Sequence, residues 1–163
     1  MDIQSFREMY LKELLEAQSV ETQLIEALPR MKELASNGGL KQAIAKHLDE
    51  TQSQLDQIDI SLKQHGADPV QHTDQSMSTL IDESEKWVQM LEGATLRDAG
   101  LIASAQKIGH YQIAAYGTLA CWAEHLGLEE DLAMLSQILK QGKTFDENLS
   151  ELAKRNFNPD ALP

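Results

Sequence analysis

Four long segments of this sequence place an apolar residue at nearly every third or fourth position, a pattern that few folds other than a helical bundle accommodate. Residues with this spacing lie along one face of an α-helix, and that face must be buried against another element. Helix-breaking residues separate the segments, at Asn37-Gly38-Gly39, Gly66 and Gly127. The predicted helices span 2–36, 40–65, 95–126 and 129–155. Because the connections within the first pair and within the second pair are short, each pair is predicted to be an antiparallel hairpin.

A shorter segment with helical periodicity lies between the two hairpins, from about residue 74 or 76 to residue 91. A loop that contains Asp68-Pro69 precedes it. An antiparallel pair followed by a long connection to a second pair is the ferritin-like topology. We therefore predict an all-α fold, a ferritin-like four-helix bundle whose two antiparallel helical hairpins are joined by a crossover segment containing a short fifth helix. The 163 residues suit a single ferritin-like domain, 1–163, with an irregular tail from about residue 156.

Local signals add details that a structure can check. Asp2 or Ser5 is expected to cap the first helix, and Thr95 with Asp98 resembles a capping box at the start of the third long helix. Cys121 falls within an apolar helical pattern, so we expect a buried, unreactive thiol. His65 lies beside the loop that follows the second helix and carries little functional signal.

Composition excludes some partners and indicates a compartment. The formal net charge is −12, and an acidic surface repels nucleic acid phosphates and anionic membranes, so neither is an expected partner. A single cysteine permits no disulfide within the chain, which suits a reducing compartment. The sequence has neither a signal-peptide pattern nor a stretch apolar enough to span a membrane. We expect a cytoplasmic protein.

Polar side chains interrupt the apolar faces of the first two helices. Glu21 lies on the inward stripe of the first helix, and His47, Glu50 and Gln54 follow one another at helical spacing on the second. A buried carboxylate needs a partner, because its desolvation alone is very unfavourable. A metal ion between Glu21, His47 and Glu50 would satisfy all three. The alternative is a metal-free hydrogen-bond cluster, in which Glu21 is protonated or paired with a His47 imidazolium.

The later helices lack the acids that a two-metal site needs. Gly109 and Gln112 occupy the inward face of the third long helix near its middle, and Gln141 and Gly142 occupy the comparable level of the fourth. Neither glycine nor glutamine neutralises the charge of iron. Asp146, one turn beyond Gly142, is a weaker metal-ligand candidate.

Several segments together are similar to the YciF/YciE family of bacterial ferritin-like proteins, over nearly the whole chain. Glu21-Thr22-Gln23-Leu24 with Ala27-Leu28-Pro29-Arg30-Met31 resembles the family's Ala-Glu-x-Gln-Leu…Ala-Leu-Pro-x-Met. His47-Leu48-Asp49-Glu50-Thr51-Gln52-Ser53-Gln54 resembles its His-x-x-Glu-Thr-x-x-Gln. The segments 105–119 and 139–149 complete the match. The resemblance implies a ferritin-like bundle, often dimeric, associated with bacterial stress responses and carrying a di-metal site in several members.

The departures from the family pattern fall at the implied metal site. Glu21, His47 and Glu50 match the family's positions on the first two helices. Where the family typically has Glu-His-Tyr-Glu, this chain has Gly109-His110-Tyr111-Gln112, and where it typically has Glu-Glu-Lys, this chain has Gln141-Gly142-Lys143. Acids expected from both later helices are therefore absent.

These observations lead to one hypothesis and one alternative. The hypothesis is a stress-associated, non-catalytic protein with a degenerate di-iron site, which acts as an oligomeric or partner-binding scaffold. We expect a homodimer, with a further protein partner as an option, and no cofactor beyond weakly bound iron or manganese. The alternative is a metal-dependent oxidase or peroxide-detoxifying protein that uses a rearranged mono- or di-metal site.

Overall fold

The computed structural model describes residues 3–67 and 72–157, and within these ranges it contains helices and no strand. The elements are α1 (Phe6–Leu34), α2 (Gly38–Gln64), α3 (Gln75–Gln89), α4 (Ala94–His125) and α5 (Glu129–Leu152), followed by a π-helical turn (Ala153–Phe157). Each predicted helix is confirmed with ends shifted by a few residues. Residue 2, part of the predicted loop (68–71) and most of the predicted tail (158–163) lie outside the described residues.

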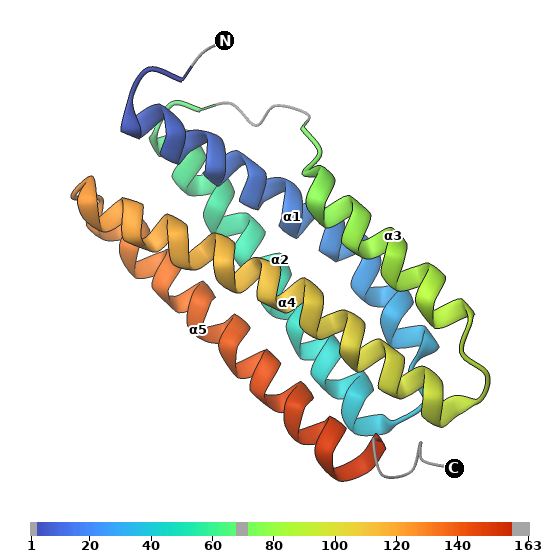
Figure 1. The fold of residues 1–163 in the computed structure, drawn as a ribbon. Coiled ribbons are helices and arrows are strands. Elements are labelled where there is room, and N and C mark those ends of the chain that lie inside the picture. The colour runs from blue at the N-terminus through green and yellow to red at the C-terminus, as the bar shows by residue number, and fades with distance from the viewer. Residues whose placement is uncertain (1–2, 68–71, 158–163) are drawn as a thin grey trace.

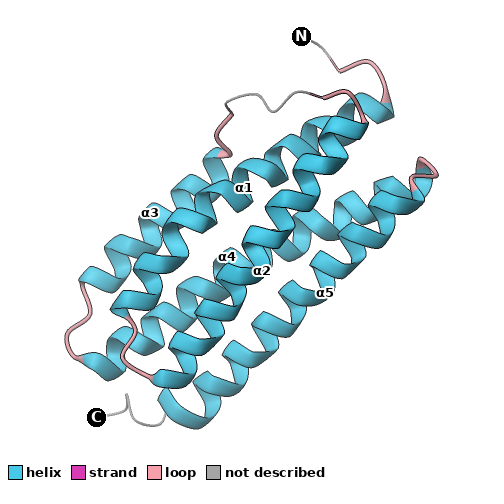
Figure 2. Cartoon of the chain, turned by 180° about the vertical axis from the view of Figure 1, so that it is seen from behind, coloured by secondary structure: helices cyan, strands magenta, loops and turns pink. Residues whose placement is uncertain are grey.

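The helices form two antiparallel hairpins with α3 packed on one side (Figure 1). α1 pairs with α2, α4 pairs with α5, and α3 lies alongside α1 and α4. The opposite view shows α2 and α5 on the face that α3 leaves uncovered (Figure 2). This is the predicted ferritin-like arrangement, in which α3 forms part of the crossover between the hairpins.

Side-chain caps explain where three of the helices begin. The Ser5 hydroxyl accepts a hydrogen bond from the Glu8 amide at 3.1 Å, as predicted for the first helix. Asn37 Oδ1 accepts from the amides of Gly39 and Leu40, which starts α2 directly after the turn. Asp74 caps α3 through its contact with the Met77 amide. Each cap satisfies backbone donors that the first turn of a helix leaves free.

The predicted capping box at Thr95 and Asp98 is wrong. α4 begins one residue earlier, at Ala94, and its N-cap is Gly93, whose positive φ of 86° suits glycine. Asp98 is buried and accepts hydrogen bonds from the Ser36 and Asn37 amides at 2.7 and 3.0 Å. Its carboxylate therefore ties the α1–α2 turn to α4, a long-range role that local sequence does not reveal.

The apolar core consists of two clusters, one toward each end of the bundle. One contains Leu24, Leu40 and Ile108 among its members, and the other contains Leu14, Ile58 and Leu119. Along every long helix the residues of one cluster give way to those of the other near the middle. A layer of polar and glycine positions separates them there, and this layer is where the sequence predicted a site.

The prediction of a buried thiol is wrong, because Cys121 is exposed on α4. The long apolar pattern of α4 covers more of the helix surface than the bundle buries, so an apolar neighbourhood in the sequence does not ensure burial. None of the described helices combines the length and apolar character that crossing a membrane requires.

Two glycines of α4 offer a matched stability test. A Cβ added at Gly117 meets nothing within 4 Å, whereas one added at Gly100 overlaps the Leu91 side chain and lies 3.2 Å from Trp87 Nε1. Gly117→Ala is therefore expected to raise the free energy of unfolding by about 0.5–1 kcal/mol, the difference in helix propensity. Gly100→Ala should give no such gain, because Leu91 must be displaced. Urea denaturation of both variants checks the prediction, and equal effects would contradict it.

Candidate functional site

The four long helices meet in a central polar layer between the two apolar clusters. Its members are Glu21 of α1; His47, Thr51 and Gln54 of α2; Gly109, Gln112 and Tyr116 of α4; and Gln141 and Gly142 of α5. Helical spacing explains why these side chains turn inward. On α4, for example, Gln112 lies three residues after Gly109 and four before Tyr116, so all three share one face. The sequence-based candidates Glu21 and His47 both lie within this layer.

The Gln112 amide joins Glu21 to His47. Its Nε2 donates to Glu21 Oε1 at 2.9 Å, and its Oε1 lies 3.2 Å from His47 Nε2. Because Gln112 Oε1 can only accept, His47 Nε2 is the donor in the second contact. One neutral side chain of α4 thus links an acid of α1 with an imidazole of α2.

Glu21 is the most deeply buried acid of the layer, with no exposed surface. Tyr116 Oη donates to the same Oε1 at 2.5 Å, while Oε2 has no hydrogen-bond partner among the described residues. Burial raises the pKa of Glu21 to about 7, although the hydrogen bonds from Tyr116 and Gln112 act in the opposite direction. Because Oε1 already accepts two hydrogen bonds, the proton of the neutral acid belongs on Oε2.

His47 is held as a neutral ring. Burial lowers its pKa to about 4, and the hydrogen bond with Gln112 only partly offsets this. The ring stacks on Phe145 of α5, with centroids 4.0 Å apart and planes 6° from parallel. Its Nδ1 has no hydrogen-bond partner in the described structure. The ring therefore presents a buried, unprotonated nitrogen toward the side of the layer where Glu50 lies, 4.0 Å away at its Oε2.

A second pair of amides extends the layer toward α5. Gln54 Nε2 donates to Gln141 Oε1 at 2.8 Å, whereas Gln54 Oε1 and Thr51 Oγ1 have no hydrogen-bond partner among the described residues. The space bounded by His47, Gln54, Gln112 and Gly142 leaves no room for a water molecule. The layer is therefore closely packed as well as polar.

Two of the predicted site residues lie at the margin or outside the layer. Glu50 is only partly buried, and its Oε1 lies 3.7 Å from Lys46 Nζ on the surface of α2. Burial raises the pKa of Glu50, with Lys46 acting against this. Asp146 contacts His110 Nε2 and Gln106 Nε2, both at 3.2 Å, on the outer side of the α4–α5 pair. No three or more His, Cys, Asp and Glu side chains in the described part of the chain come together closely enough to hold a metal ion.

A second buried polar group, near the end of the bundle where α4 meets α5, escaped the sequence analysis. Asp131 of α5 accepts from Tyr10 Oη at 2.7 Å, Ser61 Oγ at 2.9 Å and His65 Nε2 at 2.6 Å. Burial opposes ionisation of Asp131, but the hydrogen bonds from these three residues hold its pKa below the ordinary value. Arg7 lies 2.9 Å from His65 Nδ1. The i, i+4 spacing of Ser61 and His65, which places both side chains on one face of α2, is the sequence signal that indicates this group.

The layer can exchange protons and form hydrogen bonds, and it offers a few unsatisfied acceptor atoms. The arrangement of the helices defines a ferritin-like fold. The chain belongs to the family described as "Domain of unknown function (DUF892)", which matches residues 5–162.

Similarity to known proteins supports the assignment. The chain is 35% identical to Protein YciF of Escherichia coli (strain K12) over 162 residues, which cover 99% of this chain and 98% of that protein. The crystal structure of YciF, described there as a stress protein, matches with a TM-score of 0.90 over 96% of this chain and 99% of that one. YcfI from Rhodopseudomonas palustris matches with a TM-score of 0.88 and 35% identity, over 91% of this chain and 95% of that one.

A more distant match shows the fold alone. A two-domain protein from Anabaena variabilis contains a DJ-1/ThiJ/PfpI-like domain and a ferritin-like domain. It aligns with 95% of this chain and 38% of its own, at 17% identity and a TM-score of 0.68. The ferritin-like topology predicted from the sequence is therefore confirmed.

Proposed function

We propose that this chain is a stress-associated, non-catalytic ferritin-like protein in which a metal-free polar layer stands in place of a di-metal centre. It acts through its surface, as an oligomeric or partner-binding scaffold. A cytoplasmic location is part of the proposal, because an exposed single thiol suits a reducing compartment. The stress association comes from the similarity to YciF.

The observation that carries the proposal is the position of Gln112. This side chain stands where the resemblance places an acid, and its amide hydrogen-bonds both Glu21 and His47. A carboxylate there would accept from His47 but repel an ionised Glu21, unless a cation lay between them. The amide satisfies both groups without a cation.

The charge of the layer also disfavours a di-metal centre. Glu21 and Glu50 are the carboxylates available at or beside it, and together they would neutralise only half of the charge of two divalent ions. Gly109 and Gly142 contribute no ligand, and Gln54 already binds Gln141. The residues present therefore do not fit the two-metal centre that the fold implies.

One observation favours the alternative of a single weak metal site. Glu21 Oε2 and His47 Nδ1 are both buried without partners, and Glu50 Oε2 lies 4.0 Å from that nitrogen. Carboxylate and imidazole are ligands that iron and manganese accept. Such a site could support oxidase or peroxide-detoxifying chemistry, and it predicts a metal content that depends on Glu21.

Metal content tests the proposal directly. The protein would be produced with ample iron and manganese, purified without chelator or an affinity metal, and measured by elemental analysis. We expect well under one metal ion per chain, and no difference between the protein and its Glu21→Ala variant. About one ion per chain that is lost in Glu21→Ala would favour the alternative. Two ions per chain would overturn the proposal.

A further inference from the structure

A series of contacts connects the buried Asp131 to the surface and joins the start of α1 to the end of α2. Arg7 lies in the first turn of α1, and His65 is the C-cap residue of α2. Arg7 Nη2 lies 2.9 Å from His65 Nδ1, and His65 Nε2 lies 2.6 Å from Asp131 Oδ2. Arg7 is exposed, His65 is partly buried and Asp131 is buried, so the series runs from solvent into the bundle.

The two neighbours of the His65 ring fix the position of its proton. A guanidinium has only N–H donors, so Nδ1 must accept the hydrogen bond from Arg7. Burial opposes ionisation of Asp131, but hydrogen bonds, that from Tyr10 first, hold its pKa below the ordinary value, so it is a carboxylate at neutral pH. A carboxylate can only accept, so Nε2 carries the proton. The structure therefore holds a neutral ring that is protonated at Nε2.

A second proton on this ring would end one contact and strengthen the other. It would bind Nδ1, where it would point at the Arg7 guanidinium and bring two donors and two positive charges together. The contact between Nε2 and Asp131 would become a charge-assisted hydrogen bond between an imidazolium and a carboxylate. Arg7 and a proton therefore compete for the same ring nitrogen, and the exposed arginine is the group that can move away into solvent.

The other groups around the ring do not take part in this competition. Further titratable side chains on the elements around it are Tyr10 of α1, Lys63 of α2, and Glu129 and Glu130 of α5. Burial raises the pKa of Tyr10, which packs edge-on against the ring and stays neutral. The two glutamates line a surface pocket beside the ring, and with Asp131 they favour its charged form. The lysine is exposed, and among the described residues Arg7 is the only cation within hydrogen-bonding distance of the ring.

We propose that these contacts form an acid-sensitive latch, the His65 latch, in which Arg7 holds the start of α1 to the end of α2 only while His65 is neutral. Histidine is the side chain that changes its charge between about pH 5 and 8. When Nδ1 takes up a proton, Arg7 is released and the first turn of α1 loses this tie to α2, while Asp131 retains the ring. The stability that Arg7 contributes through this contact is therefore present at higher pH and lost as pH falls. The inference does not depend on the proposed function.

A double-mutant cycle tests the His65 latch. Arg7→Met removes the donor, and His65→Phe removes both ring nitrogens but keeps a ring against Tyr10. The parent, both single variants and the double variant are unfolded with urea at one pH where nitrogen NMR of the parent shows a neutral His65 ring and at one where it shows a charged ring. With the neutral ring we expect a proton on Nε2 and a coupling between Arg7 and His65 of about 5-fold in the unfolding equilibrium constant. With the charged ring the coupling should vanish or change sign.

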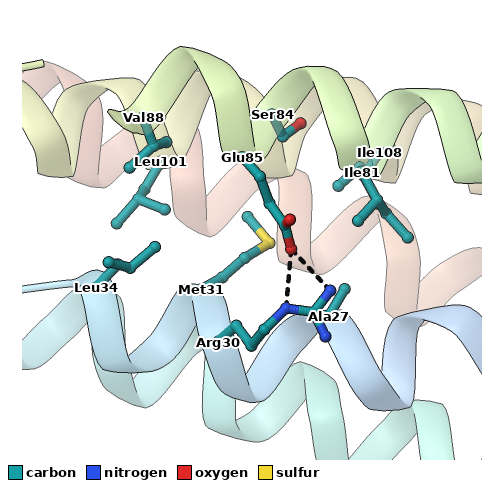
Figure 3. Close-up of a pocket in the computed structure, with 10 residues that line it drawn as sticks. All are labelled: Ala27, Arg30, Met31, Leu34, Ile81, Ser84, Glu85, Val88, Leu101 and Ile108. Atoms are coloured by element: carbon teal, nitrogen blue, oxygen red, sulfur yellow. Dashed lines mark hydrogen bonds and ion pairs between the residues drawn. The ribbon is translucent and has the colours of Figure 1, made fainter. Parts of the chain in front are cut away.

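The matched control is Arg30, the other arginine of α1. Its Nη2 lies 2.7 Å from Oε1 of Glu85 on α3, at the edge of an apolar cavity between the two helices (Figure 3). This arginine also joins α1 to another helix, but its partner is a carboxylate, so no imidazole nitrogen is shared with a proton. Arg30→Met should therefore change the unfolding equilibrium constant by the same factor whether His65 is neutral or charged.

Two results would overturn the inference. One is a neutral ring protonated at Nδ1, because Arg7 could then not donate to it. The other is a coupling of equal size with the neutral and the charged ring. If His65→Phe did not fold, Arg7→Met alone would decide: it should destabilise the protein about 5-fold more with the neutral ring than with the charged one, and an effect as independent of pH as that of Arg30→Met would contradict the latch.

Discussion

A variant that carries Gly109→Glu, Gln112→Glu and Gly142→Glu is expected to bind two divalent metal ions per chain. The three changes place carboxylates on the α4 and α5 sides of the polar layer, at positions where the YciF/YciE family typically has acids. With Glu21 and Glu50 they provide five carboxylates, enough to neutralise two divalent ions, and His47 adds an imidazole.

The backbone of this protein leaves room for the Cβ atom of a new side chain at both glycines. Gly109 and Gly142 are both buried, yet a Cβ added at Gly109 meets nothing within 4 Å. One added at Gly142 meets Ile113 Cγ1 at 3.6 Å, an ordinary contact. Replacing a glycine within a helix also removes a propensity penalty of about 1 kcal/mol at each position. The backbone positions of Gly109 and Gly142 therefore accept a side chain at Cβ without strain.

The metal-free form of this variant should be less stable than the parent chain, because several carboxylates would face one another in a buried layer. Binding of the metal ions should restore the stability that the metal-free variant has lost. A ligand at 1,000 times its dissociation constant stabilises the folded state by about 4 kcal/mol. Thermal unfolding with and without iron(II) or manganese(II) measures this difference, and elemental analysis gives the number of ions.

The matched control replaces the same glycines with Gly109→Gln and Gly142→Gln and retains Gln112. These side chains have the size of glutamate without its charge, so the control should bind no metal and show no stabilisation. Equal metal content in the two variants would mean that these positions are not ligand positions. The absence of the acids would then not explain the chemistry of this chain.

Much of the fold follows from periodicity. The four long helices and α3 were predicted because their apolar residues recur at helical intervals between glycine-containing breaks, and the structure places them as expected. Glu21 and His47 were predicted to lie in the interior for the same reason, and both are buried. Helical phase determines which face a residue occupies, so it can be read from one sequence.

What periodicity could not supply was the partner of each buried side chain. The hydrogen bond from Tyr116 to Glu21 joins residues 95 positions apart, so no local pattern in the sequence indicates it. Asp98 was assigned to a local cap and instead binds the α1–α2 turn. His65 was set aside as a loop residue, yet it contacts Asp131 across the bundle. These contacts depend on how the helices are placed relative to one another.

The last prediction concerns pH, and it follows from the opposite pKa shifts of Glu21 and His47. The folded state raises the pKa of Glu21 from 4.5 to about 7, so it holds this proton where the unfolded chain has released it. Stability from this group is therefore lost as pH rises between 4.5 and 7. The folded state lowers the pKa of His47 from 6.5 to about 4, so stability from this group is lost as pH falls through that window. Each of these pKa changes corresponds to about 3 kcal/mol of stability.

In the parent chain the pH-dependent contributions of Glu21 and His47 to the free energy of unfolding nearly cancel between pH 4.5 and 6.5. Glu21 takes up a proton on folding in this range, whereas His47 releases one. Glu21→Gln removes the contribution of Glu21. Near pH 4 the variant and the parent should have the same free energy of unfolding. At pH 8 that of the variant should be about 3 kcal/mol higher, because the parent buries an ionised Glu21 at this pH. His47→Gln should behave in the opposite sense, losing stability as pH rises from 4.5 to 7.

Urea denaturation at pH 4, 5.5 and 8 measures these differences, with Glu26→Gln as the control for removing an exposed acid from α1. The control should follow the parent at all three pH values. If Glu21→Gln gained no more stability at pH 8 than Glu26→Gln, Glu21 would have to be compensated by a positive charge. A bound cation is one source of that positive charge, so this result would count against a metal-free layer. The pH profile and the metal content therefore test the same proposal by independent physical routes.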